Sequence, residues 1–99
     1  MLDLPFAAAL DGEEIVAVAG TIIVHGTCGL IGNFVTRADR RGHGWARRLA
    51  RHLAWELQQL GIAHVWLVTT ADNTSACRAY EAAGYQVEER WRQLDLAAA

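Results

Sequence analysis

Cysteine is scarce in this 99-residue sequence, which contains two, Cys28 and Cys77. They lie far apart and match no disulfide or zinc-ligand spacing, so neither a disulfide framework nor a metal site is predicted. We expect two free thiols that are buried or chemically inert. The sequence therefore predicts no metal ion in any functional site.

Long apolar runs are also missing. No stretch of about 18 apolar residues occurs, and no basic residue precedes the first apolar stretch at the N-terminus. Membrane-spanning chains normally carry such an apolar stretch, and secreted chains normally carry basic residues before their first apolar stretch. We therefore expect a cytoplasmic protein without a membrane partner.

A strong net charge is absent as well, because the formal charge is −2 and the isoelectric point is about 6.0. Such a chain has no overall attraction to nucleic acid or to an anionic membrane, so neither is expected as a partner. The charge is unevenly placed, however. All nine basic residues are arginines, and six of them form what we call the arginine cluster: Arg37, Arg40, Arg41, Arg47, Arg48 and Arg51. We expect an anion to bind there, and a nucleic-acid surface is the weaker alternative.

The length and composition favour one domain over residues 1–99, since 53% of the residues are hydrophobic. A chain of this size buries roughly 60 to 68% of its unfolded surface, which makes its stability modest. A homodimer would add to that stability.

Hydrophobic patterning predicts seven elements. The expected strands are about 6–10, 14–24, 29–36, 63–70 and 85–96, and the expected helices are about 45–60 and 73–83. Asp11-Gly12 favours a tight hairpin, while Gly61 and Gly84 are typical helix ends. The order predicts an α/β fold with a mixed sheet (α+β), in which the apolar strand 63–70 lies centrally.

The most informative segment, residues 33–46, runs from a strand through arginines and glycines into a helix. Free N–H groups and the helix dipole at a helix start favour phosphate. Gly42 and Gly44 allow a tight turn and a close approach of backbone to a diphosphate. The alternative is an exposed arginine loop with two ordinary turn glycines. Neither the dinucleotide fingerprint nor the Walker pattern is present.

Two motifs resemble those of the GCN5-related N-acetyltransferases, the GNAT family. The first is Arg41-x-x-Gly44-x-Ala46, which is similar to the family's Arg/Gln-x-x-Gly-x-Gly/Ala signature. The second consists of Asn73, Ala76, Tyr80, Gly84 and Tyr85, which match Asn-x-x-Ala-x-x-x-Tyr-x-x-x-Gly-Phe/Tyr at every spacing. The resemblance covers about residues 11–96.

The resemblance implies an acyl-CoA N-acyltransferase fold with acetyl-CoA as the acyl donor. Two parallel strands, about 29–36 and 63–70, would splay apart around the pantetheine arm. The residues assigned to acetyl-CoA are Phe34, Val35 and Thr36 through the main chain, Arg41, Gly42, His43, Gly44, Trp45 and Ala46 around the diphosphate, and Asn73, which can also cap its helix. Arg40 is a further candidate for a phosphate contact.

For catalysis the resemblance implies Tyr80 as the general acid that protonates the departing thiolate. Taken alone, Tyr80 could equally be a core aromatic residue. Many family members carry a glutamate base where this sequence reads Ile31-Gly32-Asn33. A base would then have to be an ordered water or His25, unless the amine arrives neutral.

The family's usual first strand and helices have no counterpart before Leu4. The acceptor site is therefore expected to be open or completed by a second subunit. The function predicted is N-acetylation of a primary amine, and the alternative is a non-catalytic CoA-binding or assembly module of the same fold.

Overall fold

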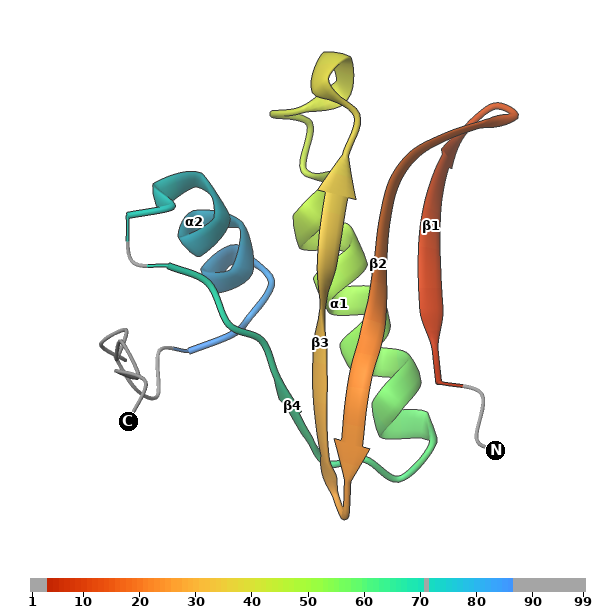
Figure 1. The fold of residues 1–99 in the computed structure, drawn as a ribbon, viewed down its shortest axis with the longest axis vertical. Helices are drawn as coiled ribbons and strands as arrows, with labels where there is room; N and C mark the ends of the chain where they lie inside the picture. Colours follow the sequence, from red (N-terminus) through yellow and green to blue (C-terminus); the bar gives the residue numbers. More distant parts are fainter. Residues whose placement is uncertain (1–3, 71, 87–99) are drawn as a thin grey trace, which may run out of the picture.

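The computed structural model of the protein describes residues 4–70 and 72–86. Its elements are β1 (Phe6–Asp11), β2 (Glu14–His25), β3 (Cys28–Thr36), a 3-10 turn (Ala38–Arg40), α1 (Trp45–Gln59), β4 (His64–Trp66) and α2 (Thr74–Ala82), as drawn in Figure 1. Neither helix has the length and apolar character that a bilayer crossing requires.

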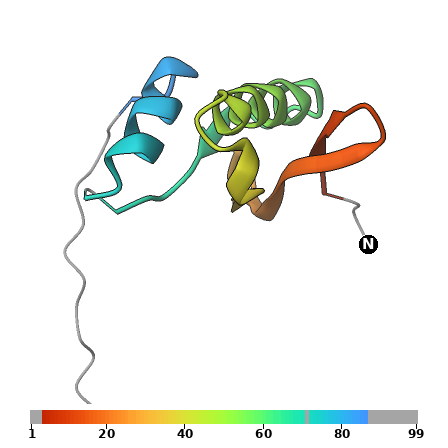
Figure 2. The ribbon, with the colours of Figure 1, turned by 90° about the horizontal axis from the view of Figure 1, so that it is seen from above.

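The four strands form one mixed sheet in the order β1-β2-β3-β4. β1, β2 and β3 pair antiparallel in sequence, and β4 pairs parallel with β3. Helix α1 lies across one face of this sheet, and α2 packs beside α1 (Figure 2). The mixed α/β architecture predicted from the order of the elements is confirmed.

The core lies between α1 and the sheet. Leu53 and Leu57 on α1 are fully buried, and they belong to the same apolar cluster as Ile31 on β3. Each buried leucine contributes about 2 kcal/mol by leaving water. The three- and four-residue spacing of the leucines is what selects a helix with one apolar face.

Both helices end where the sequence predicted. After α1, the Ile62 N–H donates to the Leu57 carbonyl at 3.0 Å, and the Gly61 N–H donates to the Gln58 carbonyl at 3.1 Å. Gly61 takes a φ of 87°, which a side chain would disfavour. This stop turns the chain from α1 directly into β4.

Strand β4 is much shorter than the predicted strand over residues 63–70, and it lies at an edge of the described sheet. It pairs with β3 at three positions, from Cys28–His64 to Leu30–Trp66. The expectation of burial on both faces is wrong within the described residues, because Val68 is 76% exposed. An apolar run alone cannot show whether a neighbouring strand stays within hydrogen-bonding distance. The predicted strand 85–96 lies outside the described residues except for its first two.

Cysteine burial is a second correction. Both thiols are free, as predicted, but Cys28 is exposed and Cys77 is half-buried. Cys28 faces away from α1 because its neighbour Gly29 faces Leu57 and Ile62.

A matched pair of isoleucine substitutions tests this core. Ile31 is 1% exposed and Ile23 is 56% exposed. Ile31→Val should lower the free energy of unfolding by about 1 kcal/mol, because it leaves a small cavity. Ile23→Val should change it by less than about 0.5 kcal/mol. Denaturant unfolding measures both, and equal losses would contradict the placement of the core.

Candidate acetyl-CoA site

The third strand contains a bulge at Asn33. Val18 faces Val35 and Gly20 faces Gly32, so β3 has one residue more than β2 over this interval. Asn33 has a φ of 56° and is the one non-glycine residue with positive φ in residues 4–70 and 72–86. Asparagine tolerates this conformation better than most side chains. The bulge bends β3 away from the line along which β4 begins.

Beyond this bend, β3 is paired on one side. Val35 pairs with Val18 and Thr36 with Ala17 on β2, whereas the ladder to β4 ends at Leu30. Figure 1 shows β3 and the chain after β4 running apart from that point. Within the part of the chain that the structure describes, the peptide groups of residues 34–36 therefore have no strand partner on the β4 side. These are the residues predicted to bind pantetheine through the main chain.

The loop into α1 turns as the glycines predicted. Gly42 has a φ of 82° and Gly44 a φ of 81°. Gly44 is the residue before α1, and no side chain caps the helix. The N–H groups of residues 45–47 have no acceptor among the described residues, and the helix dipole makes this end positive. The loop therefore presents unpaired donors suited to an anion.

Two members of the arginine cluster already have carboxylate partners. Arg37 donates to Glu14 at 3.1 Å and to Asp39 at 3.0 Å, and Arg40 donates to Asp11. The hydrogen bond from Arg37 to Glu14, followed by the charge of Asp39, raises the pKa of Arg37. Because these pairs are exposed to solvent, which screens their charges, they contribute little to stability. Arg40 is thus committed to the β1–β2 turn, which argues against its predicted phosphate contact.

Other side chains around the loop are accessible or packed on α1. Arg41 and His43 are exposed, while Ala46 is half-buried in the first turn of α1. The guanidinium of Arg48 lies 5.0 Å from the centre of the Trp45 ring, within the range of a cation–π contact. Arg41 forms no ion pair with a described residue, so it is the arginine of this loop best placed to meet a phosphate.

Tyr80 is both a core residue and a neighbour of the bent strand. It is 9% exposed, and its ring centre lies 5.1 Å from that of Phe34 on β3, with the planes tilted by 56°. Its hydroxyl forms no hydrogen bond with any described residue. Burial, and then the neighbouring Cys77, raises the pKa of Tyr80 above 10.0. The phenol therefore stays protonated at neutral pH.

Asn73 has the capping role that its position suggested. Its side-chain oxygen accepts a hydrogen bond from the Ala76 N–H at 3.3 Å, at the start of α2. This bond satisfies one of the free donors of the helix.

His25 is too distant to act as a base near Tyr80. It ends β2 and pairs with Cys28, the first residue of β3, whereas Phe34 lies six residues further along. At about 3.3 Å per residue the separation is about 20 Å. This separation argues against the suggestion that His25 serves as the base. No group of three potential metal ligands occurs within the described ranges.

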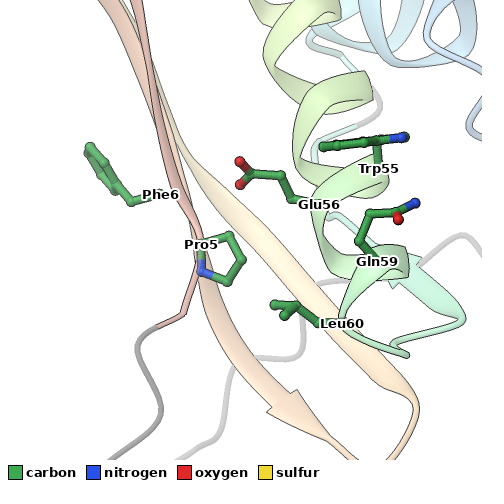
Figure 3. A pocket seen from close by; sticks show the side chains of 6 residues that line it. All are labelled: Pro5, Phe6, Trp55, Glu56, Gln59 and Leu60. Atoms are coloured by element: carbon green, nitrogen blue, oxygen red, sulfur yellow. The ribbon is translucent and has the colours of Figure 1, made fainter.

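A groove of about 350 Å³ lies elsewhere, between the start of β1 and the last turns of α1. It is lined by Pro5, Phe6, Trp55, Glu56, Gln59 and Leu60. In Figure 3, Glu56 projects from α1 toward β1, while Phe6 points away from the helix. None of the predicted site residues lines this groove, which lies at the opposite end of α1 from Gly44.

With this geometry in view, comparison with known proteins gives a consistent answer. Residues 2–85 match the model of the acetyltransferase (GNAT) family. A protein of Agrobacterium tumefaciens strain C58, described as an acetyltransferase, superimposes with a TM-score of 0.81 and 25% identity, over 96% of this chain and 70% of that one.

Two further structures agree. A Clostridium acetobutylicum protein, also described as an acetyltransferase and solved with acetyl-CoA, has a TM-score of 0.70 and 25% identity, over 94% of this chain and 64% of that one. The ribosomal-protein-S18-alanine N-acetyltransferase of Escherichia coli has a TM-score of 0.71 and 28% identity, over 82% and 52%. The chain thus spans between 52% and 70% of these three structures. No curated protein sequence matches it.

The two tyrosines of the chain provide a pH test of the site. Burial raises the pKa of Tyr85 to about 12, with a smaller contribution from Tyr80. The folded protein therefore keeps phenol protons that the unfolded chain has lost, so stability is fully present below pH 10 and falls as the pH rises toward about 12. We expect near-ultraviolet phenolate absorbance to develop above the ordinary tyrosine range. Tyr85→Phe should remove the later transition. Titration of both phenols near pH 10 in the folded protein would contradict the described burial.

Proposed function

This chain belongs to the acetyltransferase (GNAT) family, and we propose that it transfers an acetyl group from acetyl-CoA to a primary amine with Tyr80 as the general acid. One observation carries the proposal. Three features come together around Phe34 and the Gly44 loop: the side of β3 and the N–H groups at the start of α1, both unpaired among the described residues, and the phenol of Tyr80. A donor with peptide-like, anionic and thioester parts would use all three.

The pantetheine arm would lie along the unpaired side of β3. Its amide groups resemble peptide groups, so Phe34, Val35 and Thr36 would bond it as a neighbouring strand would. The free edge of the strand is what supports this assignment.

The diphosphate would lie against the loop, held by the backbone of Arg41, Gly42, His43, Gly44, Trp45 and Ala46. The unpaired donors and positive φ angles support the fit. The Arg41 guanidinium would add a charge-assisted contact. Asn73 would act on the donor mainly by fixing the start of α2, since its side-chain oxygen already caps that helix.

In the chemical step, the amine nitrogen attacks the thioester carbonyl carbon and the carbon–sulfur bond breaks. The thiolate takes the proton of the Tyr80 hydroxyl, and the proton that the amine loses restores the phenol through water. A phenol of pKa above 10.0 and a thiol of about 8.5 make this transfer uphill by at least about 2 kcal/mol, which a positioned donor can accommodate.

The amine would arrive neutral or lose its proton to water. Residues 31–33 carry no carboxylate, and His25 is about 20 Å away by strand length. Turnover should therefore rise with pH through the pKa of the acceptor amine itself. The E. coli neighbour is an N-acetyltransferase of an alanine of ribosomal protein S18, which supports an amine on a protein as one acceptor class.

A second candidate function is CoA binding without turnover, in a binding or assembly module. One observation favours it: residues 31–33 carry no carboxylate that could act as the base. A panel of primary amines separates the two functions. The exposed Cys28 thiol itself gives a signal in a thiol assay, so a sample without amine serves as the blank. Release of CoA thiol above this blank with any amine excludes the module.

Binding of the donor is tested by calorimetric titration with acetyl-CoA. Arg41→Glu and Gly44→Glu should each weaken binding at least about tenfold, because each places a negative charge beside the diphosphate. Arg78→Glu, on the exposed surface of α2, makes the same charge change as Arg41→Glu outside the loop and should bind as the parent does. Equal affinities for the parent and the loop variants would contradict the assignment.

The role of Tyr80 is tested by Tyr80→Phe, which keeps the ring packed on Phe34 and removes the acid. We expect kcat to fall about 100-fold, since general acids commonly contribute this much. The Kd for acetyl-CoA should change less than about threefold, because the phenol acts on the departing thiolate. An unchanged kcat would remove Tyr80 from the mechanism.

A further inference from the structure

The end of α2 links Tyr80 and Tyr85 through the backbone. The Tyr85 N–H donates to the Tyr80 carbonyl at 3.0 Å, and the Gly84 N–H donates to the Glu81 carbonyl at 3.0 Å. Gly84 has a φ of 102°, a conformation that favours glycine and lets the chain turn back to bond the last turn of α2. Any displacement of Tyr85 is therefore transmitted directly to the turn of helix that carries Tyr80.

The side chain of Tyr85 crosses to the other helix. Its hydroxyl donates to the Ala50 carbonyl at 2.9 Å. Ala50 is fully buried in α1, and its carbonyl oxygen has a second lone pair beyond the one used in the helix. Burial keeps the pKa of Tyr85 well above neutral pH, so this donor is always protonated there.

This contact joins the two halves of the proposed site. Ala50 lies five residues after Trp45, so the bond reaches α1 about 7.5 Å from the end that faces the diphosphate. Among the described elements, α2 packs chiefly on α1. Between β4 and α2, the described residues 67–70 and 72–73 form no strand. The rotation of α2 about its own axis is held by this bond together with the packing of Tyr80, Ala76 and Ala83 on the core.

We propose that Tyr85 is a positioning residue for Tyr80: the bond from its hydroxyl to the Ala50 carbonyl fixes α2 on α1, and thereby sets the distance between the phenol of Tyr80 and the sulfur of a donor held at the start of α1. The inference rests on the proposed function. Proton transfer depends steeply on such a distance, because a displacement of about 1 Å can cost up to about 100-fold in rate. The Phe34 ring limits movement of Tyr80 from the side of β3.

The test is Tyr85→Phe, which keeps the ring and removes the hydroxyl. We expect kcat to fall about three- to tenfold, while the KM for acetyl-CoA changes less than about twofold. Hydrogen exchange at residues 80–84 should become several-fold faster, with exchange along β1 and β2 unchanged. The phenylalanine ring fills the same space in the core, so the substitution should leave the protein folded.

A matched control separates positioning from general loss of stability. Ala7 on β1 is 6% exposed and lies in the core away from α2, so Ala7→Gly loosens the fold without touching the link. Its kcat should equal that of the parent well below the melting temperature. If Ala7→Gly lowers kcat as much as Tyr85→Phe does, or if Tyr85→Phe leaves kcat unchanged, the positioning role is overturned.

The exchange measurement distinguishes this inference from the proposed function. If the parent turns over no amine, the proposed function and the catalytic part of the inference both fail. The exchange rates then test the bond between the Tyr85 hydroxyl and the Ala50 carbonyl by themselves. Faster exchange confined to α2 then supports a tether between the helices. Unchanged exchange in Tyr85→Phe removes the tether altogether.

Discussion

The structure depends on one interruption: β3 and β4 pair at three positions and then part. A sheet normally satisfies its backbone groups by continuing the ladder. Here the bulge at Asn33 bends β3, and the chain after Trp66 leaves the sheet for α2. The peptide groups left on β3 are chemically equivalent to an empty strand position. Under the proposed function, a pantetheine arm, which carries amides at intervals, would occupy that position.

Helix α1 serves two purposes, one through its apolar face and one through its N-terminal end. Its leucines form the core with the sheet, which orients the helix. The same orientation presents its first N–H groups, which have no acceptor in the described part of the chain, next to the end of β3. The arginines of the preceding loop fall into two groups, those in ion pairs and one that stays exposed. Arg37 and Arg40 attach the loop to the β1–β2 turn, and Arg41 stays exposed beside Gly42. Part of the positive charge in the arginine cluster therefore holds the loop in place through ion pairs.

Helix α2 carries Tyr80, which belongs both to the packed core and to the proposed chemistry. Tyr80 lies in the core against Phe34, so the two interpretations of this residue, core aromatic and proton donor, do not exclude each other. The Tyr80 phenol is packed against Phe34 on one side and linked through Tyr85 to α1 on the other, so few orientations are available to it. Such restriction is what a short-range proton transfer requires.

The sequence by itself determined the elements with strong local signals. The period of Leu49, Leu53 and Leu57 specified α1, and Gly61 and Gly84 specified the helix ends, because these depend on neighbours within a few residues. The two motifs also identified the family before any coordinates. Local preferences did not reveal where β4 ends or that β3 carries a bulge, since both follow from pairing across the sheet. An asparagine directly after Gly32 was the one local sign of that bulge.

Only the tertiary structure decided which charged and polar groups are engaged. No spacing rule connects Arg40 to Asp11 or Tyr85 to Ala50, residues that lie 29 and 35 positions apart in the sequence. The same holds for His25, whose distance from Tyr80 is fixed by the length of β3. Contacts between residues distant in sequence depend on how whole elements pack, and the physical reason is that packing sums many small interactions that no short segment contains.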